Sequence, residues 1–325
     1  MSFFEIERFT DGWKRAATVA RSVSNETGIS QIMLLCDMVR CRLRYGAYIE
    51  NYRDFMFHRL NGFGKREFLT QAKRVRFANR LNQRELWNCF DNKEIFLEVF
   101  HEFIHRRWLS SGKASEKQVW NFIRENGSVI AKPLDSTFGK GIFKIHADQV
   151  SDPIEYCRGI KEKRLLLEEV VQQHPIMASL NPCMVNTVRM ITIMDKDGKP
   201  FLLATLLRTG VTEIPVDNTF AGGIAAGVDP ESGIVTTTAI GNECVRHIRH
   251  PYSGTVIPGF QIPLWEKAKT MVLQAALVNP GARFIGWDVA ITNDYPLLIE
   301  GNSKPHEAVQ VASQVGIYKK ILQYL

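Results

Sequence analysis

The segment 286–302 most constrains the fold, because it has the pattern of a β-hairpin with an acidic face. It reads Gly-Trp-Asp-Val-Ala-Ile-Thr-Asn-Asp-Tyr-Pro-Leu-Leu-Ile-Glu-Gly-Asn. Asn293-Asp294 is a turn signal between two apolar runs, and a register centred there sets Asp288 directly opposite Glu300. Because side chains alternate faces along a strand, Asn302 falls on the same side as Glu300.

This acidic face predicts a cation site. Two carboxylates that face each other across antiparallel strands repel unless a cation or a proton lies between them. Carboxylate and amide oxygens suit Mg²⁺ better than zinc. The hairpin therefore predicts a magnesium site made by Asp288, Glu300 and Asn302. On this segment alone, the alternative is a solvated hairpin edge whose acids face water.

Length and composition set the class of protein. With 325 residues, 45% of them apolar, the chain can bury at least one large core and has room for two or three domains. It has no uncharged apolar run of about 18 residues, and acids stand near its N-terminus, where a signal peptide is basic. Six scattered cysteines without a C-x-x-C pair suit reduced thiols. We expect a soluble cytoplasmic protein without a membrane span.

The formal charge of +7 is unevenly distributed. Residues 1–110 hold 19 Lys or Arg against 13 Asp or Glu, whereas the remainder holds 22 against 21. The densest basic stretch, 65–84, contains seven cations and the single acid Glu67. Such a stretch could bind nucleic acid, an anionic membrane surface or a polyanionic substrate. Because aromatic platforms are not interleaved with the cations, we favour a solvated helix face and expect no nucleic acid.

Two regions with different residue patterns follow one another along the chain. Residues 1–125 show helical spacing of apolar residues and precede the first proline, Pro133. From about Val129, short β-branched runs alternate with Gly, Pro, Asn and Asp, which indicates an α+β half over 126–325. Helical patterns cover 6–23, 29–48 and 93–109 in the first region, and 151–163, 264–278 and 306–323 in the second.

A strand, a glycine loop and a second strand open the α+β half. The apolar run 128–133 contains Lys132 near its end, the loop 134–141 follows, and a second run covers 142–145. Glycine lets backbone amides approach phosphate oxygens closely, and a lysine adds a point charge. The loop lacks the Walker pattern, so a glycine hairpin with a solvated lysine remains the alternative. Further on, the strand 165–171 breaks into polar residues, where a strand end can offer backbone groups to an adenine edge.

A second hairpin brings two arginines together. Asp197-Gly198 signals a two-residue turn that pairs Lys196 with Lys199 and therefore sets Arg208 opposite Thr187. Arg189 then lies diagonally across from Arg208 on the same face. Phosphate or carboxylate is the natural partner of converging guanidinium groups, and exposed arginines on a sheet face are the alternative. The loop 218–223, which ends in two glycines, suits closure over a substrate.

The order of these features resembles the ATP-grasp superfamily over about residues 126–310. Within it, the run 185–189, the loop 218–223 and the helical first half are similar to the sugar-transfer-associated ATP-grasp proteins. The resemblance implies an ATP-grasp fold, in which two α+β subdomains clasp ATP, over 126–325. It also implies that the helical region 1–125 helps to shape the acceptor site.

The resemblance implies roles for individual residues. Lys132 would hold the α- and β-phosphates, and the loop from Asp135 to Gly141 would cover the γ-phosphate. Arg208 would steady the γ-phosphate and an acyl-phosphate, with Arg189 beside it on the substrate side. The loop residues are Ser136, Thr137, Gly139, Lys140 and Gly141; the adenine hinge is Glu168, Glu169 and Val171, with Gln173 or His174 near the ribose; and the magnesium ligands are Asp288, Glu300 and Asn302.

Relatives of this kind use Mg-ATP to turn a carboxylate into an acyl-phosphate, from which an amine displaces phosphate. The resemblance thus implies a carboxylate–amine ligase with ATP and Mg²⁺. Its substrates would be a small carboxylate and an amine, such as a sugar acid or an amino acid, in polysaccharide or natural-product biosynthesis. An alternative is a phosphotransferase of the same fold acting on a hydroxyl. In a third interpretation, the ATP site is vestigial and the basic stretch binds an anionic surface or nucleic acid.

The sequence also contains a motif that is typical of a different enzyme class. His101-Glu102-Phe-Ile-His105 matches the H-E-x-x-H pattern, in which two histidines one helical turn apart bind zinc and the glutamate acts as base. Neighbouring apolar residues suggest a packed helix, and no third ligand is evident nearby. A zinc metallohydrolase is therefore the lesser alternative.

Overall fold

The computed structural model describes residues 3–134, 141–212, 222–241 and 245–324. They form two compact units, one from residues up to Arg80 together with residues from His306 onward, the other from Leu81 to Pro305. This division does not follow a boundary at residue 125, because 81–125 pack with the sheets and the C-terminal helices pack with the N-terminal ones. None of the described helices is long and apolar enough to cross a bilayer.

The first unit is helical. Its elements are α1 (Phe3–Thr27), α2 (Gln31–Tyr45), α3 (Ile49–Asp54), η1 (Phe57–Arg59), α4 (Gly62–Glu67), α5 (Gln71–Leu81), α12 (Ala308–Ser313) and α13 (Tyr318–Leu322). The helices expected over 6–23 and 29–48 are confirmed. The single helix expected over 306–323 is wrong, because Gln314 adopts a left-handed φ of 55° between α12 and α13. The core gathers buried rings, among them Tyr52, Phe55, Phe57 and Phe68.

Gln310 of α12 joins the C-terminal helices to this unit. Its side chain is fully buried, and its Oε1 accepts hydrogen bonds from the amides of Leu69 at 2.8 Å and Ile317 at 3.1 Å. Its Nε2 donates to the carbonyl of Leu69 at 3.0 Å. One amide therefore satisfies three buried backbone groups, which would otherwise carry a desolvation cost.

We predict that Gln310→Ala destabilises the first unit by about 3 kcal/mol or more, because three buried backbone groups lose their partner. Hydrogen exchange of amides in α4, α5 and α12 should report this as faster exchange. Gln323→Ala, the same substitution at an exposed position, should leave the exchange of these amides unchanged. Equal protection in the two variants would contradict this role for Gln310.

The second unit is built on a seven-stranded antiparallel sheet in the order β11-β10-β5-β6-β7-β8-β9. The strands are β5 (Thr187–Met194), β6 (Pro200–Thr209), β7 (Ile224–Val228), β8 (Ala239–Ile240), β9 (Arg246–His247), β10 (Phe284–Ile291) and β11 (Pro296–Asn302). Helix α11 (Trp265–Val278) packs on one face, which we call the core face. α10 (Pro175–Ala178) precedes β5.

Aromatic residues from short helices complete the core face. Trp287 of β10 makes edge contacts with Phe90 and Phe100, with ring centroids 6.1 Å and 5.2 Å away. The helical elements here are η2 (Arg84–Leu86), α6 (Trp87–Asp91), α7 (Lys93–Val99) and η3 (His101–Phe103). The expectation of one helix over 93–109 is therefore wrong beyond Val99. Residues 108–110 instead form a strand.

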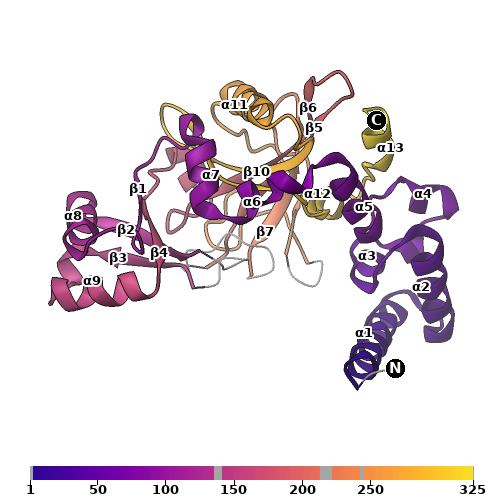
Figure 1. Cartoon of the computed structure of the whole chain (residues 1–325). Coiled ribbons are helices and arrows are strands. Elements are labelled where there is room, and N and C mark those ends of the chain that lie inside the picture. Colours follow the sequence, from indigo (N-terminus) through magenta and orange to yellow (C-terminus); the bar gives the residue numbers. More distant parts are fainter. Residues whose placement is uncertain (1–2, 135–140, 213–221, 242–244, 325) are drawn as a thin grey trace. The chain divides into compact units, whose positions relative to one another are not determined.

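A four-stranded antiparallel sheet, in the order β1-β4-β2-β3, forms the other half of this unit. Its elements are β1 (Trp108–Ser110), α8 (Glu116–Asn126), β2 (Ser128–Pro133), β3 (Phe143–His146), η4 (Ala147–Gln149), α9 (Pro153–Glu162) and β4 (Leu165–Glu169). α8 and α9 lie against one face of the sheet (Figure 1). The strands expected over 128–133 and 142–145 are confirmed, as is the mixed α+β class with a helical N-terminal region.

Candidate functional site

The β10–β11 hairpin pairs Asp288 directly with Glu300, as predicted, and an irregularity between Asp288 and Val289 shifts the register by one residue from there to the turn. The chain turns through 292–295, where the Thr292 hydroxyl donates to the carbonyl of Tyr295 at 2.6 Å. Gly301, between Glu300 and Asn302, lies toward the core face. A Cβ there would lie 2.8 Å from the Phe96 ring and 2.9 Å from the Phe90 ring. The glycine thus lets the aromatic cluster close over β11.

The two arginines also meet as predicted, because Arg208 pairs with Thr187 and Arg189 pairs with Asp288. The turn that was expected to set this register is different, since Met194 pairs with Pro200 and not Lys196 with Lys199. The Asp195 carboxylate accepts from the amides of residues 197 and 199, both at 2.9 Å, and so holds a wider loop. An irregularity at residue 203 on β6 restores the expected register further along.

Asp288 lies between the two guanidinium groups. Arg189 donates to both carboxylate oxygens, with its Nη2 2.8 Å from Oδ2, and the Nη1 of Arg208 lies 2.8 Å from the same oxygen. The Asp288 side chain is only 5% exposed. Although burial alone would raise its pKa, Arg189 and Arg208 outweigh it and hold the pKa of Asp288 well below the usual range. The anion between the arginines is therefore supplied by the chain itself.

Glu300 has the opposite electrostatic situation. Its carboxyl group reaches solvent, yet desolvation by the surrounding protein and the neighbouring Asp288 charge raise its pKa. Asn302 donates a hydrogen bond from Nδ2 to Oε1 of Glu300 at 3.3 Å. A carboxyl with a raised pKa beside a buried carboxylate marks a place where a proton or a cation is favoured.

The fit to magnesium depends on this pair of acids and the adjacent amide. No cluster of three or more His, Cys, Asp or Glu suited to a metal occurs among the described residues. The candidate set is instead two carboxylates and one amide oxygen, a donor set that suits Mg²⁺. Both carboxylate oxygens of Asp288 accept hydrogen bonds from arginines. Asp288 can therefore bind a metal ion only if at least one of these arginines binds another anion.

A second ion-pair cluster lies on the four-stranded sheet. Glu168 of β4 is 3% exposed and pairs with Lys132 of β2 and with Arg106, whose Nη2 lies 2.5 Å from Oε1. Burial alone would raise the pKa of Glu168, but Arg106 and Lys132 lower it to about 2. The Glu168 side chain is thus occupied within the chain, and only its backbone is left for the predicted adenine hinge.

Arg106 links this cluster to the hairpin. It donates from Nη1 to the carbonyl of Leu298 at 2.5 Å and from Nη2 to the carbonyl of Ile299 at 3.2 Å. Ile299 immediately precedes Glu300, so one guanidinium connects the Lys132–Glu168 pair to the acidic strand. No motif in the sequence marks Arg106 as part of the site. Its one available signal was position, because it lies two residues before β1 and next to a second arginine.

The end of β2 is held by Lys93, which donates to the carbonyls of Pro133 and Leu134, both at 3.0 Å. Gly141, at the other end of the loop, has a φ of +74°, and a Cβ there would lie 2.9 Å from Pro133. A residue with a side chain would be strained at this position. The loop residues Ser136, Thr137, Gly139 and Lys140 lie outside the described residues, as do residues 218–221 of the second loop.

Residues 169–173, at and after the end of β4, differ from the predicted adenine and ribose contacts in the side-chain partners they have. Glu169 is half-exposed, and its carboxylate accepts from the amide of Arg107 at 3.1 Å. Val171 is half-buried. Gln173 uses its amide for four hydrogen bonds within the chain, two donated to carbonyls of residues 181 and 184 and two accepted from Asn186. With both oxygen lone pairs and both N–H groups occupied, the Gln173 side chain has a structural role and is not free for a ribose.

The H-E-x-x-H pattern does not form a zinc site. Helix α7 ends at Val99, residues 101–103 form a short 3₁₀ turn, and His105 has a left-handed φ of 48°. The two histidines therefore do not share one face of an α-helix, which this motif requires. His101 Nδ1 lies 3.1 Å from the carbonyl of Glu98, and the His105 ring contacts Tyr295 with centroids 4.9 Å apart.

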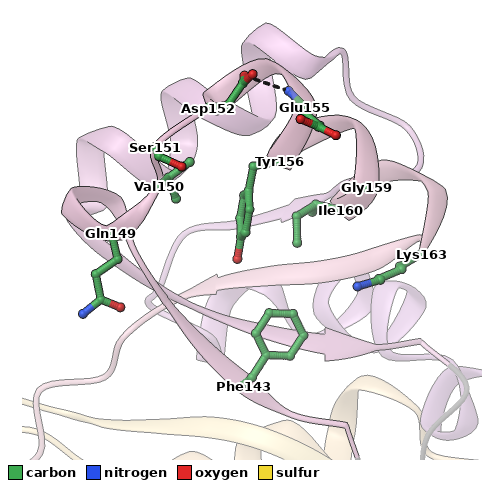
Figure 2. A pocket seen from close by; sticks show the side chains of 10 residues that line it. All are labelled: Phe143, Gln149, Val150, Ser151, Asp152, Glu155, Tyr156, Gly159, Ile160 and Lys163. Carbon is green, nitrogen blue, oxygen red and sulfur yellow. Dashed lines mark hydrogen bonds between the residues drawn. The ribbon is translucent and has the colours of Figure 1, made fainter.

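Two surface pockets lie on the four-stranded half. One, of about 620 Å³, is bordered by Glu169, Val170 and Gln172, so it reaches the predicted hinge. The other, of about 330 Å³, lies between β3 and α9, where Tyr156 points toward the ring of Phe143 (Figure 2). Neither is lined by the acids or arginines of the hairpin. Among the described residues, the candidate site is therefore recognised by its ion pairs.

The family model for sugar-transfer associated ATP-grasp proteins matches residues 72–324. The chain belongs to this family. The ATP-grasp family consists of ATP-dependent carboxylate–amine ligases. The resemblance inferred from the hairpin, the lysine strand and the arginines is thereby confirmed. No curated protein matches the sequence.

Solved ATP-grasp structures are similar at low identity. The ligase PsnB, in complex with a phosphomimetic variant of minimal precursor, Mg and ADP, is 14% identical with a TM-score of 0.47, covering 85% of this chain and 71% of PsnB. D-cycloserine synthetase DcsG is 12% identical with a TM-score of 0.44, covering 77% and 79%. D-alanyl-alanine synthetase A from Vibrio cholerae is 14% identical with a TM-score of 0.40, covering 73% and 60%. Since these TM-scores are below 0.5, the assignment of this ATP-grasp protein rests on the family model.

We predict that ionised Glu168 stabilises this ATP-grasp protein and that this stabilisation is lost when the pH falls. Its pKa lies near 2 in the folded chain against an ordinary 4.5, so its stabilising contribution is present above pH 4.5 and is lost as the pH falls toward 2. In Glu168→Gln, the free energy of unfolding should therefore fall less steeply over this window, by about 3 kcal/mol in total.

Denaturant unfolding at a series of pH values measures this difference. Glu169→Gln removes the same charge at the neighbouring half-exposed position and is the matched control. If both variants flatten the pH dependence equally, Glu168 is not its source.

Proposed function

We propose that this protein is a Mg-ATP-dependent ligase that activates a carboxylate as an acyl-phosphate and joins it to an amine. The observation that supports this most directly is the pairing of Asp288 with Glu300 beside Arg189 and Arg208. Two acids and two guanidinium groups on adjacent strands provide separate partners for a divalent cation and for phosphate oxygens. Membership of the ATP-grasp family supports the same chemistry.

We assign the two arginines different parts in this chemistry. Phosphate oxygens bind guanidinium groups as carboxylates do, so the γ-phosphate of a bound nucleotide would compete with Asp288 for Arg208. Arg189 makes two hydrogen bonds to Asp288 and is therefore the better anchored of the two. Arg208 would steady the γ-phosphate and then the acyl-phosphate, while Arg189 would keep Asp288 in place.

Asp288, Glu300 and Asn302 would hold the magnesium. Once Arg208 turns to phosphate, Oδ2 of Asp288 keeps the hydrogen bond from Arg189 and regains a lone pair that can bind a cation next to the Glu300 carboxyl. A divalent cation there would replace the proton that the raised pKa of Glu300 favours in its absence. Mg²⁺ bound here would neutralise the negative charge on the transferred phosphoryl group.

The other end of the nucleotide would lie on the four-stranded sheet. Lys132 has three N–H donors, so it can keep Glu168 and still donate to the α- and β-phosphates. The loop residues Ser136, Thr137, Gly139, Lys140 and Gly141 would cover the phosphates. Backbone groups of 168–171 would bind the adenine edge, beside the 620 Å³ pocket. We leave Gln173 out of the ribose site because its amide is already satisfied.

The reaction needs no nucleophile from the protein. A substrate carboxylate oxygen would attack the γ-phosphorus as ADP leaves, and the amine nitrogen would then attack the carbonyl carbon, lose a proton and expel phosphate. The residues named above act by positioning and by charge neutralisation. Sugar acids and amino acids are the carboxylates we propose to screen first, with ADP and phosphate release as the readout. ADP formed together with a phosphorylated hydroxyl, and no free phosphate, would indicate the phosphotransferase instead.

We predict that Glu300→Ala removes the effect of magnesium on nucleotide binding. Calorimetric titration with a non-hydrolysable ATP analogue should show about a tenfold or greater gain in affinity from Mg²⁺ in the parent protein and none in the variant. Asp294→Ala removes an acid at the exposed turn of the same hairpin and should keep the full magnesium effect. An unchanged magnesium effect in Glu300→Ala would refute the metal assignment.

We predict that Lys132→Met weakens binding of the same analogue by about tenfold or more, with or without magnesium, because a charge-assisted contact to phosphate is lost. Lys117→Met, at an exposed position of helix α8, which packs on the same sheet, is the control and should bind normally. It removes the same charge and lines neither surface pocket. Equal affinities in the two would mean that Lys132 is purely structural.

A further inference from the structure

Helix α2 has two apolar faces, of which only one is buried. Leu34, Met38, Cys41 and Tyr45 face the core of the first unit. A second set repeats the same four-three-four spacing and lies on the opposite side of the helix, given about 100° per residue. We call it the outer stripe; it consists of Ile32, Cys36, Val39 and Leu43.

The outer stripe is open to solvent over its full length. Ile32 is 73% exposed and Leu43, at the other end, is 83% exposed. Val39 is 47% exposed and Cys36 is exposed between them. A surface helix normally carries polar residues on this side. Contiguous exposed apolar residues of this size mark a surface that contacts something else.

Arginines border the outer stripe on both sides. By helical phase, Arg40 and Arg44 lie along one edge and Arg42 lies along the other, and all three are exposed. The guanidinium of Arg42 stacks over the Tyr48 ring at 3.9 Å. The single acid of α2, Asp37, does not offset them because Lys65 neutralises it through an ion pair of 2.6 Å. The solvent-facing surface of α2 is thus an apolar strip between cationic borders.

The charge of the whole unit has the same sign. Residues 1–80 and 306–325 contain 17 Lys or Arg and 9 Asp or Glu, a surplus of eight, whereas residues 81–305 contain 24 against 25. The positive charge of the protein therefore belongs to the unit that carries α2. A strongly basic surface favours an anionic partner and opposes pairing with a second copy of itself.

We propose that the outer stripe of α2 binds an anionic lipid surface. The helix is about 22 Å long, so it suits lying in the plane of the interface. Its buried face fixes it to the rest of the unit, which leaves Ile32, Val39 and Leu43 to enter the boundary between head groups and acyl chains. Arg40, Arg42 and Arg44 would then lie at the level of the lipid phosphates, with their apolar stems against the strip.

Sedimentation of the full chain with vesicles tests this. Vesicles of phosphatidylcholine containing phosphatidylglycerol should bind the protein, and vesicles of phosphatidylcholine alone should bind it at least about tenfold more weakly. Leu43→Glu should reduce binding to the anionic vesicles about tenfold or more, and Arg40→Gln about fivefold. Ile154→Glu makes the matched change at a 64% exposed position of the second unit and should bind as the parent does.

Cys36 offers a site-specific readout within the stripe. With Cys183 and Cys244 replaced by serine, an environment-sensitive fluorophore on Cys36 should shift to shorter wavelength when anionic vesicles are added. Ile32→Glu, with an unchanged circular dichroism spectrum, provides a second variant in case Leu43→Glu is unstable.

Several results would overturn the proposal. These are no binding to anionic vesicles, equal binding by Leu43→Glu and Ile154→Glu, or no change in the Cys36 label despite binding. A dimer in sedimentation velocity that Leu43→Glu dissociates, without vesicle binding, would assign the stripe to a second copy of the chain instead.

Discussion

The ion triplet formed by Asp288 with Arg189 and Arg208 governs the arrangement of the central strands. A buried carboxylate is costly unless it is paired, and two converging guanidinium groups repel unless an anion separates them. Each group therefore stabilises the others only when β10, β5 and β6 keep one register. A shift of one residue in either strand pair would move a charge to the core face, among Trp287 and its aromatic neighbours.

The triplet is connected to the four-stranded sheet by a second buried charge. Glu168 requires Arg106 and Lys132, and Arg106 also binds the carbonyls of residues 298 and 299 on β11. The lysine proposed to bind phosphate is consequently tied to the strand that carries Glu300. One guanidinium thus links the two sheets to which we assign opposite ends of the proposed nucleotide site, and such a link would support the positioning that the proposed ligase chemistry requires.

The two units divide the physical properties of the chain between them. The sheet-containing unit is almost neutral, and it contains the two buried ion clusters around Asp288 and Glu168. The helical unit carries the positive charge and exposes the outer stripe of α2, although several cations of the 65–84 stretch are used internally. Lys65 pairs with Asp37, Arg74 with Glu307, and Lys73 donates to backbone carbonyls. The basic surface that remains is therefore better defined on α2 than in the stretch that composition alone emphasises.

The sequence by itself determined the strand pairs and the charges they carry. A turn signal and the two-residue period of a strand predicted Asp288 opposite Glu300 and Arg208 opposite Thr187. Both pairs form, although in each hairpin an irregularity between the turn and the pair shifts the register by one residue. Tertiary structure decided what distant residues do to these groups. It brought Arg106 to Glu168 across 62 positions, satisfied Gln173 with Asn186, ended the H-E-x-x-H helix at Val99 and attached residues 306–325 to the N-terminal helices. Such contacts depend on packing between elements, for which local periodicity holds no information.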